Sequence, residues 1–244
     1  DGQKINENAI WDGNNFVLDI SSIVGIENLG KVSNVIGGNY DATTGKLLLG
    51  TPEYSRVSAR YYFDTGTTAI SSGMEVGITV SIPEYIVASG DCGSNGDSLT
   101  WSLNSKGVIT ISGMGEMRDY LDDKGFVFPI PWADYTSQIK EVIIEDGVTS
   151  IGAQAFNHCE KLTRLIIPDS VVTIGRYAFF VCKELSTLTI PAGVESIGRY
   201  AFSNCESLAD ISVDASNRYY MSKDGVLYNK AMTELLLCPS SKIG

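Results

Sequence analysis

Three nearly identical ten-residue segments stand at equal intervals in the second half of this chain. They read SIGAQAFNHC at residues 150–159, TIGRYAFFVC at residues 173–182 and SIGRYAFSNC at residues 196–205, an offset of 23 residues each time. An active site is normally built once, so verbatim repetition indicates a structural unit rather than a catalytic one.

The apolar positions of the repeat are constant, whereas the residues between them vary. One unit cannot cover its own apolar edge, so we expect these positions to line up from coil to coil and form one shared core. The equivalent residues are Ile151, Ile174 and Ile197; Gly152, Gly175 and Gly198; Phe156, Phe179 and Phe202; Cys159, Cys182 and Cys205; Leu162, Leu185 and Leu208; Leu165, Leu188 and Ile211; and Ile167, Ile190 and Val213.

Spacing within one unit predicts its local structure. Ile174, Ala178 and Cys182 are four residues apart, which predicts one side of a short helix. Leu188 and Ile190 alternate with threonines, which predicts a half-buried strand followed by a Pro-Ala-Gly turn. The glycine after each isoleucine is expected to relieve crowding or to permit a positive φ. The strand pattern IKEVIIEDG indicates that the stack starts near residue 139.

The unit IGxxAFxxCxxLxxLxIPxxVxxIG resembles the BspA-like leucine-rich repeats of bacterial surface proteins. The segments LTWSLNSKGVITISGMGEMRDY and SKDGVLYNKAMTELLLCP resemble the opening of such arrays and the hairpins that interrupt them. The resemblance covers residues 90–244. It implies export, cell-surface display and binding of host or matrix proteins, and it brings no catalytic residues.

Two further regions complete a mixed, mainly β chain. Residues 99–112 read as a β-hairpin, and we expect this hairpin and Trp132 to cap the open end of the stack. A sugar-stacking platform formed by Trp101 and Trp132 is the weaker alternative. Upstream of Pro83, alternating runs such as residues 57–63 and frequent turn signals predict an antiparallel immunoglobulin-like β-sandwich.

These regions give the expected domains. The sandwich takes residues 1–86, and a short leucine-rich-repeat solenoid with a hairpin cap takes residues 87–244. Within the second domain we expect an N-terminal cap over 87–138, repeats over 139–213 and a hairpin extension over 214–244. The Gly-, Ser- and Asp-rich segment ASGDCGSNGDS is the expected boundary region.

The net charge of −11 at pH 7 narrows the class of partner. Such a surface repels nucleic-acid phosphates and anionic membranes, so neither is an expected partner. No apolar stretch approaches the roughly 20 residues of a membrane-spanning helix. The chain begins DGQKINENAI, without an initiator methionine or a signal peptide, so we interpret it as a processed or excised fragment whose missing signal and anchor are uninformative.

The five cysteines are an odd number, and we expect a column of reduced thiols. Cys159, Cys182 and Cys205 are one repeat apart, which predicts buried thiols that act as small apolar side chains. Stacked coils would place their Cα atoms about 4.7–4.9 Å apart, but parallel side chains would keep the Cβ atoms beyond the ~3.8 Å typical of a disulfide. A disulfide or a metal site is the weaker alternative. Cys92 and Cys238 receive no assignment.

No catalytic constellation, metal site or cofactor is expected. His158 is the only histidine, and its counterparts are Val181 and Asn204, so we interpret it as a surface residue. The acids of YLDDKG and EDG could support glycoside hydrolysis, but they stand in turn-like segments that favour solvated loop charges. Calcium binding at DGNNFVLD or NYDATTGK is a minor alternative, because neither segment is an EF-hand loop.

Two sets of residues are the candidate binding sites. They are the outward positions of the strands, Glu141, Ile143, Arg164, Ile166, Thr187, Thr189 and Asp210, and the repeated Arg-Tyr pairs, Arg176, Tyr177, Arg199 and Tyr200. Ile143 and Ile166 are apolar where solvent is expected, so they either form a contact surface or are covered by a neighbouring segment. Arg and Tyr are favoured at interfaces, but repeat symmetry alone also explains the pairs, and we favour a scaffold role slightly.

The sequence therefore favours a non-enzymatic binding or adhesion module of a secreted or cell-surface bacterial protein. An extracellular protein or host matrix component is the expected partner along the face of the solenoid, and a glycan is a further candidate. The sandwich is a spacer or a second binding unit. The alternative function is a structural stalk that positions other domains of a larger surface protein.

Overall fold

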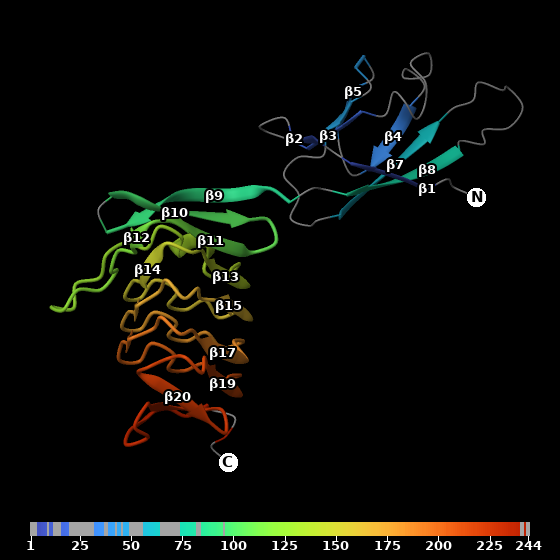
Figure 1. Ribbon diagram of the computed structural model, residues 1–244. Helices are drawn as coiled ribbons and strands as arrows, with labels where there is room; N and C mark the ends of the chain where they lie inside the picture. Colours follow the sequence, from blue (N-terminus) through green and yellow to red (C-terminus); the bar gives the residue numbers. More distant parts are fainter. Residues whose placement is uncertain are drawn as a thin grey trace, which may run out of the picture. The chain divides into compact units, whose positions relative to one another are not determined.

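The chain divides into two compact units, residues Asp1–Tyr85 and Ile86–Gly244, in a computed structural model (Figure 1). The structure describes residues 4–8, 10–11, 16–19, 32–36, 39–41, 43–44, 46–48, 56–63, 74–81, 84–94, 96–239 and 242. Each unit is built from strands, and a 3₁₀ turn, η2, spans Ala133–Tyr135.

The first unit contains two four-stranded sheets. One has the order β1 (Lys4–Asn8), β8 (Met74–Ser81), β7 (Arg56–Phe63) and β4 (Val32–Ile36). The other has the order β2 (Ile10–Trp11), β3 (Phe16–Asp19), β6 (Lys46–Leu48) and β5 (Asn39–Asp41). The alternating runs predicted as strands form β7 and β8, which pair antiparallel over their whole length. β1 pairs parallel with β8, so this sheet is not purely antiparallel, and the immunoglobulin-like sandwich stays a prediction.

The second unit opens with three antiparallel strands, β9 (Ile86–Gly93), β10 (Gly96–Asn104) and β11 (Val108–Gly113). The hairpin predicted over 99–112 is therefore confirmed. Its turn is closed by the Asn104 side chain, whose Oδ1 accepts the N–H groups of Lys106 and Val108 at 3.0 and 2.9 Å. The segment ASGDCGSNGDS, expected as a boundary, instead supplies much of β9 and the start of β10, because its glycines and serines tolerate close backbone approach.

Below this cap the chain winds in coils whose strands form parallel ladders, here called the repeat stack (residues 108–213). One ladder contains β11, β13 (Glu141–Ile144) and β15 (Arg164–Ile166), and β17 (Thr187–Ile190) pairs with β19 (Asp210–Val213). A second ladder contains β12 (Gly115–Glu116), β14 (Val148–Ile151), β16 (Thr173–Ile174) and β18 (Ser196–Ile197). β11 of the cap pairs in parallel register with β13, so the parallel ladder already includes one strand before the repeats expected from residue 139 onward.

The phenylalanines of the repeat stand in a single file, as the sequence predicted. Phe156 and Phe179 are stacked with ring centroids 5.3 Å apart, and Phe179 and Phe202 with centroids 5.2 Å apart. Trp132 extends the file by one ring, 5.3 Å from Phe156, and its Nε1–H donates to the carbonyl of Ala155 at 2.8 Å. Trp132 thus occupies the phenylalanine position of a coil that lacks the repeat signature.

The segment predicted as a short helix is a string of overlapping turns, so that prediction was wrong. The N–H groups of Ala155 and Asn157 donate to the carbonyls of Gly152 and Gln154, three residues back rather than four. Gln154 and His158 have φ of 61° and 60°, which an α-helix excludes. Each turn advances the chain by two residues, so a four-residue spacing returns apolar side chains to the same side without a helix.

Alternate N–H groups of these turns leave the coil and bond to the next one. We call the segments 152–159, 175–182 and 198–205 the turn column. Its bonds run from Gln154 to Arg176, Phe156 to Ala178, His158 to Phe180, Tyr177 to Arg199, Phe179 to Ala201 and Val181 to Ser203, N–H to carbonyl in each case. The turn column is therefore a further backbone ladder beside the ladders of strands.

Each copy of the repeat has a glycine after its isoleucine because the neighbouring backbone leaves no space there for a side chain. Gly152, Gly175 and Gly198 do not have positive φ, so that part of the expectation was wrong. A Cβ atom would lie 1.9 Å from the Arg118 carbonyl oxygen at Gly152, 2.4 Å from the Ala153 nitrogen at Gly175 and 2.5 Å from the Arg176 nitrogen at Gly198.

The stack ends in a three-stranded antiparallel meander of β20 (Tyr220–Lys223), β21 (Val226–Asn229) and β22 (Leu235–Leu237). The buried side chain of Asn217 joins it to the last coils. Its Nδ2 donates to the carbonyls of Pro191 and Val194, and its Oδ1 accepts the N–H groups of Tyr219 and Tyr220, all at 2.8–2.9 Å. All the hydrogen-bonding groups of this buried amide are occupied, so it holds the meander in one orientation.

Candidate binding surfaces of the repeat stack

The outward side chains of β13, β15, β17 and β19 form the strand face, which contains the first set of candidate residues. The register places Glu141 beside Arg164, Ile143 beside Ile166, Thr187 beside Asp210 and Thr189 beside Ser212. The ladder therefore brings sequence positions 23 residues apart into two columns. The residues of the strand face are Glu141, Ile143, Arg164, Ile166, Thr187, Thr189, Asp210 and Ser212.

Polar contacts within the strand face connect neighbouring coils. Arg164 Nη1 lies 2.5 Å from Glu141 Oε1, and the Arg164 side chain is 66% exposed. The hydroxyls of Thr189 and Ser212 are 2.9 Å apart. The Glu141 side chain is only 20% exposed, but an ion pair with one largely exposed partner at a surface adds only about 0–1 kcal/mol to stability, so Arg164 can exchange this contact for another.

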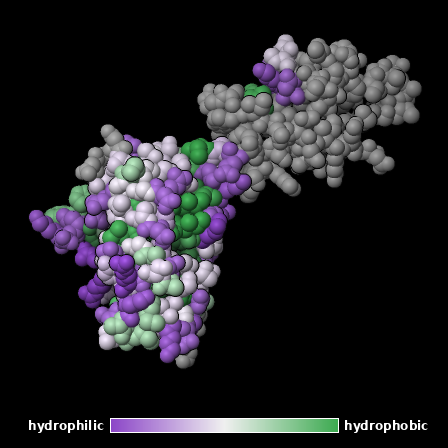
Figure 2. All heavy atoms as spheres, in the orientation of Figure 1, coloured by the Kyte–Doolittle hydropathy of each residue, from purple (hydrophilic) through white to green (hydrophobic). Residues whose placement is uncertain are grey.

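Ile143 and Ile166 are half-buried. They are therefore neither fully exposed, as an open contact surface would require, nor fully covered by a neighbouring segment. Each is paired only with strand neighbours, and their side chains keep part of their surface in solvent. Hydrophobic side chains gather on the side of the repeat stack along which β13 and β15 run (Figure 2). The strand face thus combines a small apolar centre with hydroxyls and charges around it.

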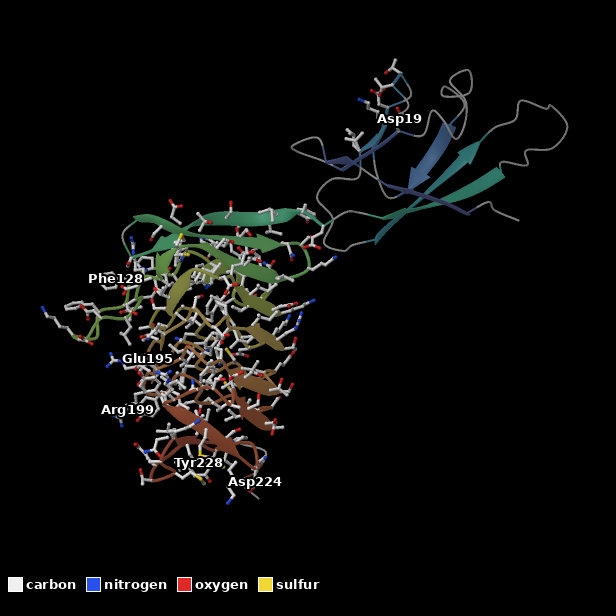
Figure 3. The ribbon with its side chains drawn as sticks, viewed as in Figure 1. Asp19, Phe128, Glu195, Arg199, Asp224 and Tyr228 are labelled. Carbon is white, nitrogen blue, oxygen red and sulfur yellow. The ribbon has the colours of Figure 1, made fainter. Side chains whose placement is uncertain are left out.

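The repeated Arg-Tyr pairs stack on each other but differ in exposure. The Tyr177 and Tyr200 rings are stacked with centroids 5.2 Å apart, and the Arg199 guanidinium lies 4.7 Å from the centroid of Tyr200. Arg176 donates through Nη2 to the carbonyl of Asp122 at 3.3 Å, so it anchors the loop that contains this aspartate. Arg199 is exposed and extends away from the stack (Figure 3). Arg176 and Tyr177 are thus half-buried, whereas Arg199 and Tyr200 are open to solvent.

The three cysteines of the repeat form a column of buried free thiols. All five cysteines are free, and the Sγ atoms of Cys182 and Cys205 each lie 3.4 Å from the phenylalanine carbonyl of the coil above, to which they can donate. Burial raises the pKa of the thiols of Cys159 and Cys205 from the ordinary value of 9.0 to about 12 and about 11. These thiols are neutral packing groups at physiological pH.

This column predicts a loss of stability at high pH. Between pH 9 and about 11–12 the unfolded chain releases the protons of Cys159 and Cys205 while the folded chain retains them. Stability therefore falls as pH rises through this window. Urea denaturation at several pH values should show a shallower decline above pH 9 in a Cys159→Ala/Cys205→Ala variant than in the unchanged chain.

Equal slopes in the two proteins would contradict the role assigned to the column. As a control on redox state, alkylation of denatured but unreduced protein should modify all five cysteines.

The other candidates from the sequence do not come together as sites. Trp101 and Trp132 are 4% and 0% exposed, so they cannot form a sugar-stacking platform. Trp101 belongs to the cap hairpin, and Trp132 belongs to the file of stacked rings. His158 is exposed, 3.9 Å from a carboxylate oxygen of Glu160. Within the described ranges, no group of three or more His, Cys, Asp or Glu side chains could hold a metal ion.

The acids considered for catalysis or calcium binding have structural partners or lie in solvent. Asp122 Oδ1 accepts the N–H groups of Lys124 and Phe126 at 2.8 and 2.9 Å and closes a loop turn, while Asp123 and the acids of EDG are exposed. Asp41 accepts hydrogen bonds from Thr43 and Thr44, which lower its pKa to about 2. Residues 12–15 of the other calcium candidate lie outside the described residues.

Two exposed apolar groups were missed by the sequence reasoning. The loop after Asp122 presents Phe126, Val127 and Phe128, which are 66%, 64% and 45% exposed (Figure 3). The meander presents Leu235 and Leu236, which are 55% and 39% exposed. The aromatic-rich run GFVFPIPW was a signal for the first group, whereas the second reads as an ordinary strand.

Residues 133–243 match the model of the BspA type leucine-rich repeat region in six copies. This region belongs to the BspA-type leucine-rich repeats. BspA-like proteins are bacterial surface proteins, generally with interaction or adhesion roles, and leucine-rich repeats are typically non-enzymatic. No curated protein matches the chain. No helix in the described part of the chain is long and apolar enough to cross a membrane.

Solved leucine-rich repeat structures also match the chain. A leucine-rich repeat protein from Eubacterium ventriosum is 27% identical with a TM-score of 0.40, and the match covers 64% of this chain and 52% of that protein. The pneumococcal vaccine antigen PcpA is 18% identical with a TM-score of 0.39, covering 65% and 57%. A leucine-rich cell surface protein from Faecalibacterium prausnitzii is 22% identical with a TM-score of 0.31, covering 59% and 60%. The chain spans between half and three fifths of the length of these proteins.

Proposed function

We propose that this chain is a non-catalytic protein-binding module of an exported bacterial surface protein, and that the strand face is its binding surface. The observation that carries the proposal is the half-buried pair Ile143 and Ile166 at the centre of a face otherwise made of hydroxyls and charges. An apolar centre with a polar rim is the usual anatomy of a protein-binding patch. Residues 1–86 then act as a spacer or a second binding unit.

The rigidity of the strand face supports the same proposal. Its side chains project from strands whose backbone groups are paired within the ladder, so little conformational entropy is lost when a partner binds. The Arg164–Glu141 pair and the threonine hydroxyls supply hydrogen-bonding groups around the isoleucines. An extracellular protein or host matrix component is the partner we propose, with a glycan as the second class.

An Ile166→Asp variant tests this proposal. We expect at least a tenfold weaker affinity for a partner found in a panel of matrix proteins and glycans, because a charge at an apolar centre costs more than about 1.4 kcal/mol of binding energy. The melting temperature should change little, because the Ile166 side chain is only half-buried. Surface plasmon resonance and thermal unfolding measure the two quantities.

The matched control is Val172→Asp, an equally apolar-to-acidic change at a residue 39% exposed and outside the strand face. It should retain full affinity. A large loss of stability in Ile166→Asp would show that Ile166 is a core residue, and an unchanged affinity would exclude the strand face. No binding to any member of the panel would favour the structural stalk instead.

A further inference from the structure

The turn column has an open end at its last coil. In the two coils before it, the N–H groups at three alternate positions donate to carbonyls of the following coil. The equivalent groups of the last coil are those of Tyr200, Phe202 and Asn204. Within the described part of the chain these three N–H groups have no hydrogen-bond partner.

The backbone of the last coil has the same conformation as the coils above it. Tyr200 and Asn204 have φ of 62° and 60°, and the N–H groups of Ala201 and Ser203 make the same three-residue turn bonds as their counterparts. The three open N–H groups are therefore directed along the stack, toward the position that a following coil would take. Backbone N–H groups are strong hydrogen-bond donors, so this row can pair with a ligand that carries acceptors at matching positions.

Residues 197–203 of the last coil, which include Tyr200 and Phe202, form one wall of a groove of about 480 Å³, and Asn204 follows just beyond this lining. The opposite wall is β22, which is the edge strand of the meander and presents the exposed side chains of Leu235 and Leu236. Tyr220 and Leu227 also line the groove. Both walls thus offer unpaired backbone groups, and the surface between them is about equally polar and apolar, with the leucines of β22 as its main apolar side chains.

The charge of the groove narrows the class of occupant. Its lining contains one cation, Arg199, and one anion, Glu234, in a chain with a net charge of −11. A neutral groove of this kind neither attracts a basic segment nor repels an uncharged one. The open N–H row calls for carbonyl acceptors at every second residue, which is the spacing that a polypeptide backbone supplies.

We propose that this groove binds a neutral, apolar polypeptide segment of another protein, whose alternate backbone carbonyls accept the N–H groups of Tyr200, Phe202 and Asn204. The segment lies between the last coil and β22, and its apolar side chains contact Leu235 and Leu236. The groove lies outside the strand face, so its occupation does not depend on the function proposed above.

Amide hydrogen exchange of the free chain, resolved by NMR, is the first test. The N–H groups of Tyr200, Phe202 and Asn204 should exchange at least tenfold faster than those of Tyr177, Phe179 and Val181, which are bonded to the next coil. Equal protection of the two sets would show that another part of this chain already fills the row, and it would overturn the proposal.

Peptide binding is the second test, with a fluorescein-labelled peptide of residues 196–208 in which serine replaces cysteine as the probe. This segment supplies the carbonyls that the coil above uses, those of Arg199, Ala201 and Ser203. We expect saturable binding with protection of the three open amides, and a scrambled peptide should not bind. A Leu235→Ser/Leu236→Ser variant should bind at least tenfold more weakly.

Two matched variants separate this groove from other surfaces. Met232→Ser changes a meander residue that is 43% exposed but does not line the groove, and it should bind the peptide normally. Ile166→Asp should also bind it normally, since that residue belongs to the strand face. Absence of saturable binding to the unchanged chain, or equal weakening by Met232→Ser, would overturn the proposal.

Discussion

Replacing Phe179 with alanine is expected to lower the free energy of unfolding by about 3–5 kcal/mol, the range for a fully buried phenylalanine. Phe179 is 0% exposed and stacks on Phe156 above it and on Phe202 below it. The change therefore removes two ring contacts and leaves a cavity in the middle of the file. Urea denaturation followed by circular dichroism measures the loss.

Phe180→Ala is the matched control, since it removes the same side chain one residue later. Phe180 is half-buried and contacts Tyr177 and His158 only edge to face, with ring centroids 5.4 and 6.2 Å away. We expect a loss of about 1 kcal/mol, the usual contribution of an aromatic pair near the surface. Similar losses in the two variants would show that the file of rings is not the centre of the core.

Gly175→Ala should also be strongly destabilising, by about 1–3 kcal/mol or more, because the coils have no space for a side chain there. Its Cβ would lie 2.4 Å from the nitrogen of Ala153 and 2.7 Å from the carbonyl carbon of Gly152. The N–H of Gly175 donates to the carbonyl of Ile151 at 2.7 Å, and this bond would have to lengthen to admit the methyl group. Thermal and urea denaturation measure the effect.

The contrasting variant is Gln154→Gly, at a position where the backbone has φ of 61° and the side chain is half-buried. Glycine removes the strain of about 1–2 kcal/mol that a left-handed backbone imposes on glutamine, which stabilises the folded chain. It also raises the conformational entropy of the unfolded chain, which opposes this gain by a similar amount, so the free energy of unfolding should change by less than about 1 kcal/mol. A mild effect of Gly175→Ala together with a severe effect of Gln154→Gly would reverse our assignment of crowding and strain.

The single file of phenylalanines and the column of thiols could be predicted from spacing alone. Both depend only on equal offsets, because a 23-residue period in a stacked coil places equivalent side chains directly above one another. The hairpin over 99–112 could be predicted from a different signal, the alternation of apolar and polar residues on both sides of the turn sequence NSKG at residues 104–107. The columns of the strand face follow from the period as well, since the register pairs residues 23 apart.

The turn column shows where spacing misled. Four-residue intervals between Ile174, Ala178 and Cys182 fit a helix, but they fit successive two-residue turns equally well. Hydrogen bonds to the next coil decide between the two. The N–H of Phe179, for example, donates to the carbonyl of Ala201, whereas in a helix it would donate to a carbonyl of its own segment. Trp132 was expected to belong to the cap, because no repeat signature surrounds it in the sequence. In the structure it extends the file of stacked rings instead.

The 23-residue period and the apolar rows could be predicted from the sequence, because stacking requires each unit to present the same side chains at the same intervals. The path of the backbone between those rows could not be predicted in this way, since its hydrogen bonds join residues of neighbouring coils that are 22 positions apart along the chain. The open N–H row beside Leu235 and Leu236 arises in the same way. It depends on which groups the last coil and the meander leave unpaired, and that is settled only when the coils and the meander are packed together.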